Sequence, residues 1–240
     1  MGDSVRLLSY NIHKGIGGRD RRYRLERIMS VIDAESPDIV CLQEVDRNVR
    51  RSRFDNQPAL LEEWFKPAAH MFQFNVKVQD GGYGNLVLSR WPFRERHQIS
   101  LTRHQRKPRG GQLAIIETPS GPLHLAHWHL GLSERERAWQ TRHVLEHYLF
   151  RQASALPTMI VGDCNDWRNI LARGPFEVHG FRQITAPPSR FRSFPAWMPV
   201  WSLDKAFVRG AIEITRVHVV RSRLTRDASD HLPLVIDFNL

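Results

Sequence analysis

The stretch from Gly162 to Asp166 places the strongest constraint on how this chain can fold. It follows a short apolar run, Leu156 to Val161, that is typical of a buried strand. The glycine permits a sharp turn, and the aspartates and asparagine after it supply oxygen acceptors where the strand ends. Because ligands of open α/β sheets bind beyond the carboxyl ends of strands, the stretch predicts a functional site there. The alternative is an Asx turn in which Asp166 caps a helix over Trp167 to Leu171.

Polar side chains also stand at the ends of other predicted strands, at positions that a hydrophobic core does not favour. If these strands lie side by side, several carboxylates meet at one edge, which is tolerable only with shared protons or a bound cation. Carboxylate and amide oxygens favour a hard ion such as Mg²⁺ or Mn²⁺ over zinc. The positions are Asn11, Glu44, His129, Asp163 with Asn165, Asp204 at the start of its strand, and Asp230 with His231.

The 240 residues show no linker, low-complexity tract or internal repeat, so we expect one domain over residues 1–240. Apolar residues with helical spacing predict a helix from Leu25 that ends before Pro37. Ser133 begins a capping-box pattern, which predicts a long helix to about Arg151. Gly81 to Gly84 is predicted to form a turn before the next strand.

The charge balance favours certain partners. Lysine and arginine number 35 against 25 acidic residues, a net charge of +10. This excess favours nucleic acid, anionic lipid headgroups or small phosphates, although a solvated arginine-rich surface has the same composition. No apolar run is long enough to span a membrane, and a strand from Val5 leaves no signal peptide. Cys41 and Cys164 form no zinc or disulfide pattern, so we expect a cytoplasmic protein.

Short motifs with these polar residues follow one another along the chain: Ser9-Tyr10-Asn11, Gln43-Glu44-Val45, Gly84 to Ser89, His129-Leu130, Gly162 to Asp166, Leu203-Asp204-Lys205 and Ser229 to Leu234. The ordered set resembles the endonuclease/exonuclease/phosphatase superfamily, which includes DNase I-like nucleases, exonuclease III-like enzymes, inositol phosphatases and bacterial sphingomyelinases. The chain is similar to a minimal bacterial, single-domain member. The resemblance implies an α+β fold, a four-layer α/β/β/α sandwich of two packed, mostly antiparallel sheets flanked by helices. The strand ends alone favour a doubly wound sheet instead.

The resemblance also implies which residues bind the metal ion and the phosphate. Glu44 and Asp230 would bind the divalent ion, Mg²⁺ or Mn²⁺. Asn11 would hold the ion or the phosphate oxygens. Asn85 and Arg109 would approach the phosphate, although for Arg109 a solvated loop position is an equal alternative.

The catalytic roles follow from the same resemblance. Asp163 would orient or deprotonate the attacking water, and Asn165 and His129 would donate to phosphoryl oxygens. His231 would be a catalytic histidine whose tautomer is set by Asp204. It could act as the base or, when protonated, stabilise the transition state, and the sequence leaves both open.

Two substrate classes remain open for this divalent-metal-dependent phosphodiesterase. The charge favours a nuclease that cleaves DNA or RNA by in-line attack of an activated water, with basic stretches such as Arg103 to Arg109 along the phosphate backbone. The alternative is a phospholipid- or inositol-phosphate-directed phosphoesterase, in which the loop from Phe194 to Trp201 touches a bilayer. No obligate protein partner is evident, and we expect a monomer. A catalytically inactive binding module is disfavoured because the acidic and histidine positions are all occupied.

Overall fold

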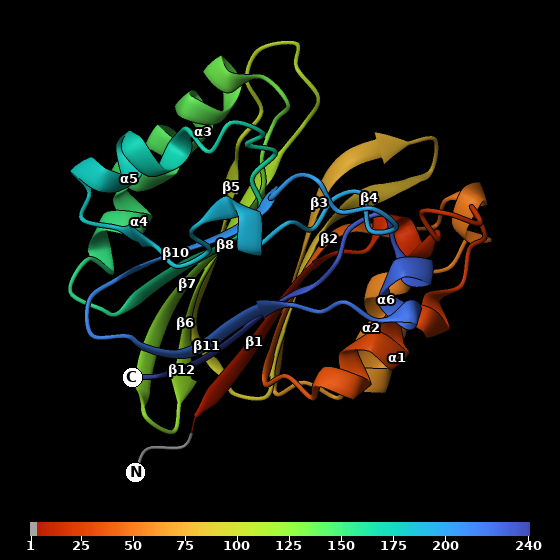
Figure 1. The fold of residues 1–240 in the computed structure, drawn as a ribbon, viewed down its shortest axis with the longest axis horizontal. Helices are drawn as coiled ribbons and strands as arrows, with labels where there is room; N and C mark the ends of the chain where they lie inside the picture. The colour runs from red at the N-terminus through yellow and green to blue at the C-terminus, as the bar shows by residue number, and fades with distance from the viewer. Residues whose placement is uncertain (1–3) are drawn as a thin grey trace.

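Two six-stranded sheets pack face to face at the centre of the molecule (Figure 1). This computed structural model describes residues 4–240. The strands of the first sheet, in order across it, are β11 (Glu213–Val219), β12 (Leu234–Asn239), β1 (Val5–Asn11), β2 (Ile39–Arg47), β4 (Gly81–Ser89) and β3 (Ala69–Val78). Those of the second sheet are β5 (Phe93–Ser100), β6 (Gly110–Thr118), β7 (Gly121–His129), β8 (Thr158–Asp163), β10 (Asp204–Arg209) and β9 (Arg182–Gln183).

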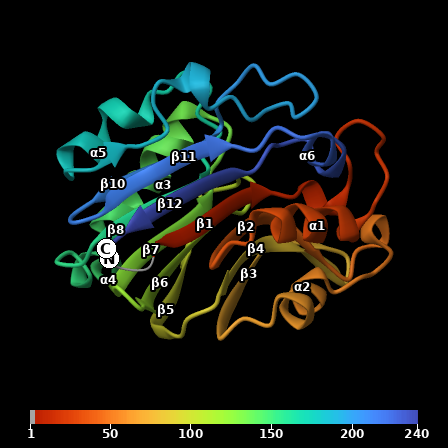
Figure 2. The ribbon, with the colours of Figure 1, turned by 60° about the horizontal axis from the view of Figure 1, so that its bottom comes forward.

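Helices cover the outer face of each sheet (Figures 1 and 2). The first sheet is covered by α1 (Leu25–Glu35), α2 (Gln57–Phe65) and α6 (Arg223–Ala228), and the second by α3 (Glu134–Glu146), α4 (Tyr148–Gln152) and α5 (Pro175–Val178). Single 3₁₀ turns cover His13–Gly15, Arg50–Ser52, Leu171–Arg173 and Pro188–Arg190. Among residues 4–240, no helix has both the length and the apolar composition needed to cross a membrane.

The predicted four-layer α/β/β/α sandwich is confirmed, and the doubly wound sheet is not formed. The β1–β2 and β7–β8 pairs run parallel, and the other paired strands of the described chain run antiparallel, as predicted for the family. Both cysteines are buried and free.

Three hydrophobic clusters fill the three interfaces between the layers. Leu7 of the first sheet packs with Leu125 and Val161 of the second in the cluster between the sheets. Leu8 belongs to the cluster that includes α1 and α2, whereas Trp128 belongs to the cluster that includes α3 and α5. Successive strand residues point to opposite faces, so inner strands such as β1 and β8 bury both of their faces.

The strand faces between the sheets change from apolar to polar toward one end of the sandwich. On β1, Leu7 is followed at two-residue intervals by Ser9 and Asn11, and on β8 the corresponding polar residue is Asp163. On antiparallel strands the polar residue comes early, as with Asp204 at the start of β10. Other members of this polar end are Gln43, Gln73, Asn85, Gln112, His127 and His129. The two-residue period of the strands thus gathers polar groups in one place.

The two predicted helices begin where expected, but one of them is shorter than predicted. The helix from Leu25 is confirmed as α1, and Ser133 caps α3 by accepting the backbone N–H of Glu136 at 3.3 Å. The predicted single helix to about Arg151 is wrong, because His147 is extended with φ −64° and ψ 136°. The ring of His147 instead caps α4, which begins at the next residue.

Two loop predictions were also wrong. Gly81 to Gly84 begin β4 instead of forming a turn. Gly82 and Gly84 lack side chains and so approach β3 closely, and a Cβ on Gly84 would collide with the Gln73 carbonyl oxygen. The alternative helix over Trp167 to Leu171 does not form. Asp166 does cap the chain there, since its carboxylate accepts the backbone N–H groups of Ile170 and Leu171 at 3.1 and 3.0 Å.

Candidate active site

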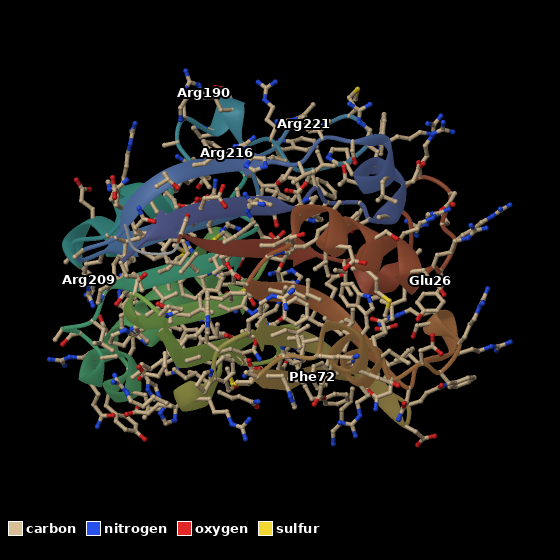
Figure 3. The ribbon with its side chains drawn as sticks, turned by 90° about the horizontal axis from the view of Figure 1, so that it is seen from below. Glu26, Phe72, Arg190, Arg209, Arg216 and Arg221 are labelled. Atoms are coloured by element: carbon tan, nitrogen blue, oxygen red, sulfur yellow. The ribbon has the colours of Figure 1, made fainter. Side chains whose placement is uncertain are left out.

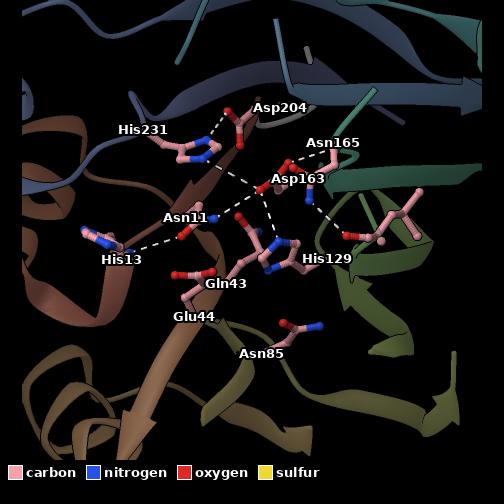
Figure 4. Close-up of polar contacts among 12 residues, drawn as sticks. Asn11, His13, Gln43, Glu44, Asn85, His129, Asp163, Asn165, Asp204 and His231 are labelled. Carbon is pink, nitrogen blue, oxygen red and sulfur yellow. Dashed lines mark hydrogen bonds and ion pairs between the residues drawn. The ribbon is translucent and has the colours of Figure 1, made fainter. Parts of the chain in front are cut away.

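The carboxylate of Asp163, at the end of β8, is the centre of the polar cluster (Figure 4). Its Oδ2 atom lies 3.1 Å from Asn11 Nδ2, 3.3 Å from His129 Nε2 and 3.7 Å from His231 Nε2. Its Oδ1 atom accepts the backbone N–H of Asn165 at 2.9 Å. Three side chains from separate parts of the chain therefore converge on one buried oxygen.

Strand register brings these residues together. His129 on β7 and Asp204 on β10 are the direct pairing partners of Asp163 on its two sides. Asn11 reaches Asp163 from the end of β1, in the opposite sheet. Gly162 has a φ of 147°, and a Cβ there would collide with the carbonyl oxygen of Trp128. Only glycine therefore fits the close approach of β7 and β8 beside the site.

His231 is bound to a second carboxylate on the side away from Asp163. Its Nδ1 atom lies 2.9 Å from Asp204 Oδ2, which also accepts the Ser193 hydroxyl at 2.5 Å. This contact leaves Nε2 facing Asp163. Burial opposes a charge on His231, but the carboxylates of Asp204 and Asp163 outweigh it and raise the His231 pKa to about 10. The imidazole is therefore positively charged at neutral pH.

His129 and Asp163 have pKa values shifted in opposite directions. Burial lowers the pKa of His129 well below its usual value, and the positive charge of Arg109 adds to this shift. Burial raises the pKa of Asp163 to about 6, against the opposing charge of His231. At pH 7 an ionised aspartate thus lies between a neutral imidazole and a charged one.

Glu44 lies at an irregularity of β2. The β2–β4 register shifts between Leu42 and Val45, and Glu44 has a φ of 58°. Such a bulge redirects a side chain out of the regular ladder. The Glu44 carboxylate forms an ion pair with the ammonium of Lys14. Burial acts to raise the pKa of Glu44, but the charge of Lys14 outweighs it and lowers the pKa well below its usual value. Glu44 is therefore ionised.

The predicted metal ligands surround the turn that follows β1. Asn11 Oδ1 accepts the backbone N–H of His13 at 3.1 Å, and His13 Nε2 lies 3.8 Å from Asp230 Oδ2. The next residue, Lys14, is the partner of Glu44. Across residues 4–240, no three His, Cys, Asp or Glu side chains are arranged to hold a metal ion. The donor types nevertheless fit a hard ion, because they are carboxylate and amide oxygens and Glu44 is ionised. Their role as ligands stays a prediction.

Asn85 and Arg109 lie at the margin of the cluster. The Asn85 amide donates to the Gly110 carbonyl oxygen at 3.1 Å, and Figure 4 places it on the Glu44 side of the site. Arg109 is only 6% exposed, yet within the described chain its Nε atom has no hydrogen-bond partner and its guanidinium forms no ion pair. Asn165, predicted to donate to a phosphoryl oxygen, uses its amide to donate to the Leu130 carbonyl oxygen at 2.9 Å.

A buried polar chain behind the site was not predicted. Gln43 Nε2 lies 2.6 Å from His127 Nε2, and His127 Nδ1 lies 2.9 Å from Gln112 Oε1. Gln112 in turn donates to the Met71 carbonyl oxygen at 2.8 Å. The chain joins the two sheets where their facing surfaces become polar. The sequence does carry a signal for this chain: each of these polar residues stands two positions away from an apolar residue of the same strand, and so on the same face.

The two packed sheets with helices on their outer faces form the DNase I-like fold. This chain belongs to the Endonuclease/Exonuclease/phosphatase family, whose sequence model matches residues 8–231. Members of the family are hydrolases that act on phosphodiester bonds, and they generally use divalent metal ions.

Individual proteins are similar to this chain in sequence or in fold. The "Uncharacterized protein YbhP" of Escherichia coli (strain K12) is 29% identical over an alignment of 257 residues. The alignment covers 99% of this chain and 97% of that protein. An endonuclease/exonuclease/phosphatase from Beutenbergia cavernae DSM 12333 has a TM-score of 0.78 at 22% identity, over 99% of this chain and 72% of that one. TDP2 from D. rerio, complexed with a single-strand DNA product, has a TM-score of 0.71 at 21% identity, over 99% of this chain and 100% of that one. These two structures share the fold.

Proposed function

We propose that this chain is a Mg²⁺- or Mn²⁺-dependent phosphodiesterase that acts on nucleic acid. The observation that supports this most is the convergence of Asn11, His129 and His231 on Oδ2 of Asp163. A phosphoryl oxygen is an acceptor of the same kind as a carboxylate oxygen. The same donors can therefore bind a phosphate that approaches Asp163.

Asp163 is suited to take a proton from the attacking water. Its pKa of about 6 leaves it ionised at neutral pH and makes it a stronger base than an ordinary aspartate. The charged His231, held by Asp204, would stabilise the negative charge that develops on the phosphoryl oxygens. The neutral His129 would donate a hydrogen bond to the same group. Of the two roles that the sequence left open for His231, this assignment favours the cationic one.

Glu44, Asp230 and Asn11 would hold the divalent ion. When bound, the ion supplies positive charge that polarises the phosphoryl group. The ammonium of Lys14, now the partner of Glu44, would have to give up that contact. Ion binding and the Lys14–Glu44 pair are therefore expected to compete.

Nucleic acid is favoured as the substrate by the charge of the molecule. The net charge is +10, and arginines such as Arg190, Arg216 and Arg221 are exposed at the surface (Figure 3). A polyanion gains from many such charges, whereas a small phosphate contacts only a few. The TDP2 structure with a single-strand DNA product has the same fold. A cytoplasmic monomer with one domain stays part of the proposal.

A phospholipid substrate is the second candidate, and one loop favours it. Trp197 and Met198 are 53% and 54% exposed, and Trp201 is 43% exposed. Phe194, in the same loop, lies with its ring centroid 4.9 Å from that of His231. An apolar tip beside a phosphoesterase site can rest on a bilayer surface.

Hydrolysis assays with plasmid DNA, single-stranded DNA, RNA and phospholipid vesicles, each with Mg²⁺ and with EDTA, test this proposal. We expect cleavage of nucleic acid that EDTA abolishes. Asp163→Ala should lower kcat at least about a hundredfold, because it removes the group that activates water. Asp80→Ala, in the exposed turn between β3 and β4, is the matched control and should retain full activity.

The outcomes separate the parts of the proposal. Turnover that persists in EDTA would contradict metal dependence. Activity on phospholipid alone would replace nucleic acid by the second candidate. Full activity of Asp163→Ala would remove Asp163 from the mechanism.

A further inference from the structure

A group of cations lies beside the site, around the ring of Tyr83 on β4. Lys14 Nζ, Arg51 Cζ and Lys107 Nζ lie 5.5, 5.1 and 5.3 Å from the ring centroid. They come from three segments: the turn after β1, the turn after β2 and the loop before β6. Each cation is attracted to the face of the aromatic ring, but like charges this close repel one another. An arrangement of this kind is stabilised by an anion.

Two of these three cations already have an anionic partner. Lys14 pairs with Glu44, and Arg51 contacts both oxygens of the buried Asp46, at 2.7 and 2.9 Å. Lys107 forms no ion pair within residues 4–240. The positive charge at this place is therefore only partly compensated.

Arg109, in the same loop as Lys107, is the second uncompensated charge. It is 6% exposed, its Nε atom lacks a hydrogen-bond partner, and no carboxylate of the described chain pairs with it. A buried guanidinium with unmade hydrogen bonds is costly, so the site is built for a group that is added later. Lys107 shares the Tyr83 ring with Lys14, the partner of Glu44, and the carbonyl oxygen of Gly110, next to Arg109, accepts from Asn85. Both charges therefore lie beside the active site.

We propose that Lys107 and Arg109 form a second phosphate subsite, which binds the phosphate next to the one that is hydrolysed. This inference rests on the proposed phosphodiesterase function and makes it more specific: the preferred substrate carries at least two phosphate groups. The second group is either the next phosphodiester of a polynucleotide strand or a terminal phosphate. Tyr83 supports the subsite by holding Lys107 over its ring.

Substrates that differ by one phosphate test the subsite. A dinucleotide has one phosphodiester, the same dinucleotide with a 5′- or 3′-phosphate adds a terminal group, and a trinucleotide adds an internal one. For the unchanged protein with Mg²⁺, we expect kcat/KM to rise about tenfold with the added phosphate, as for one charge-assisted contact. A gain from the trinucleotide alone assigns the subsite to an internal phosphodiester, and a gain from a terminal phosphate assigns it to a phosphomonoester.

The variant Lys107→Gln should reduce this preference, the ratio of kcat/KM with the added phosphate to kcat/KM without it, to within about twofold. Lys107 is exposed, so the substitution should not disturb folding. Lys77→Gln, on the exposed part of β3, is the matched control and should keep the preference. Equal kcat/KM for substrates with one and two phosphates, or a preference that survives Lys107→Gln, would overturn the subsite.

Binding separates a failure of the subsite from a failure of the proposed function. Calorimetric titration of the same oligonucleotides into Asp163→Ala requires no turnover. The affinity gained from the added phosphate should be lost when Lys107→Gln is combined with it. If no substrate is hydrolysed but this affinity difference is present, the phosphodiesterase function is wrong and the phosphate subsite stands. If the affinities are equal, the subsite is wrong.

Discussion

The charge on each side chain decides what the candidate site can do. His231 is cationic because Asp204 and Asp163 flank it, whereas His129 is neutral because it is buried beside Arg109. Two histidines of the same site thus differ in charge because their neighbours differ. The sequence identified both residues but could not assign their charges, since those depend on contacts between strands far apart in the chain.

The pair of Asp204 and His231 gives a prediction at this scale. Asp204→Asn removes the charge that favours the imidazolium, so kcat should fall about a hundredfold while KM changes little. Steady-state kinetics with the best nucleic acid substrate measure both constants. Ser193→Ala removes a hydrogen bond to the same Asp204 oxygen without changing its charge, so it should reduce kcat much less. Equal losses in the two variants would mean that the negative charge is not the cause.

Several residues near the site could not be found from the sequence. Asn11, His129, Asp163 and His231 were predicted to gather, and their side chains do converge. Lys14 was missed, because its contact with Glu44 depends on the bulge in β2, and no sequence pattern marked that bulge. The basic stretch that contains Lys107 was predicted to contact phosphate, but its meeting with Lys14 and Arg51 around Tyr83 was not. They come from separate loops, whose relative positions only the folded sheets determine.

At the scale of elements, the end of β8 depends on the close approach of β7. Gly162→Ala would place a methyl group against the carbonyl oxygen of Trp128 and strain a φ of 147°. We expect the free energy of unfolding to fall by about 2 kcal/mol or more, measured by urea denaturation. Gly121→Ala is the matched control, because its φ is 130° and nothing lies within 4 Å of the added carbon. If both variants lose equal stability, backbone strain alone is responsible and the crowding is not.

Elements with a regular pattern could be predicted, and those set by tertiary contacts could not. The spacing of apolar residues gave α1, and the capping pattern gave the start of α3. The break at His147 has no glycine or proline to mark it. β5 was not predicted, because this edge strand is polar and mostly exposed, so its sequence resembles a loop. Its pairing with β6, and not its composition, makes it a strand.

At the scale of the whole molecule, polar groups join the two sheets at the end of the sandwich that contains the site. At the opposite end, apolar residues join them. The chain Gln43–His127–Gln112 crosses the interface between the sheets. The four layers could be predicted through the resemblance to a family, but the polar contacts between the layers could not. Predicting those contacts requires the strand register of both sheets and the face to which each side chain points.

The buried side chain of His127 leads to a prediction of how stability depends on pH. Burial lowers the pKa of His127 to about 3, so the unfolded chain takes up a proton near pH 6.5 that the folded protein does not. The contribution of neutral His127 is therefore complete above about pH 6.5 and is lost as the pH falls toward 3. His127→Gln keeps a polar side chain at this position and removes the titration. Between about pH 6 and 4, the free energy of unfolding in urea should therefore fall less steeply for the variant than for the unchanged protein. The two slopes should differ by up to about 1.4 kcal/mol per pH unit. His104→Gln, in the exposed loop before β6, is the control. Parallel curves for the unchanged protein and His127→Gln would mean that His127 is not held neutral by burial.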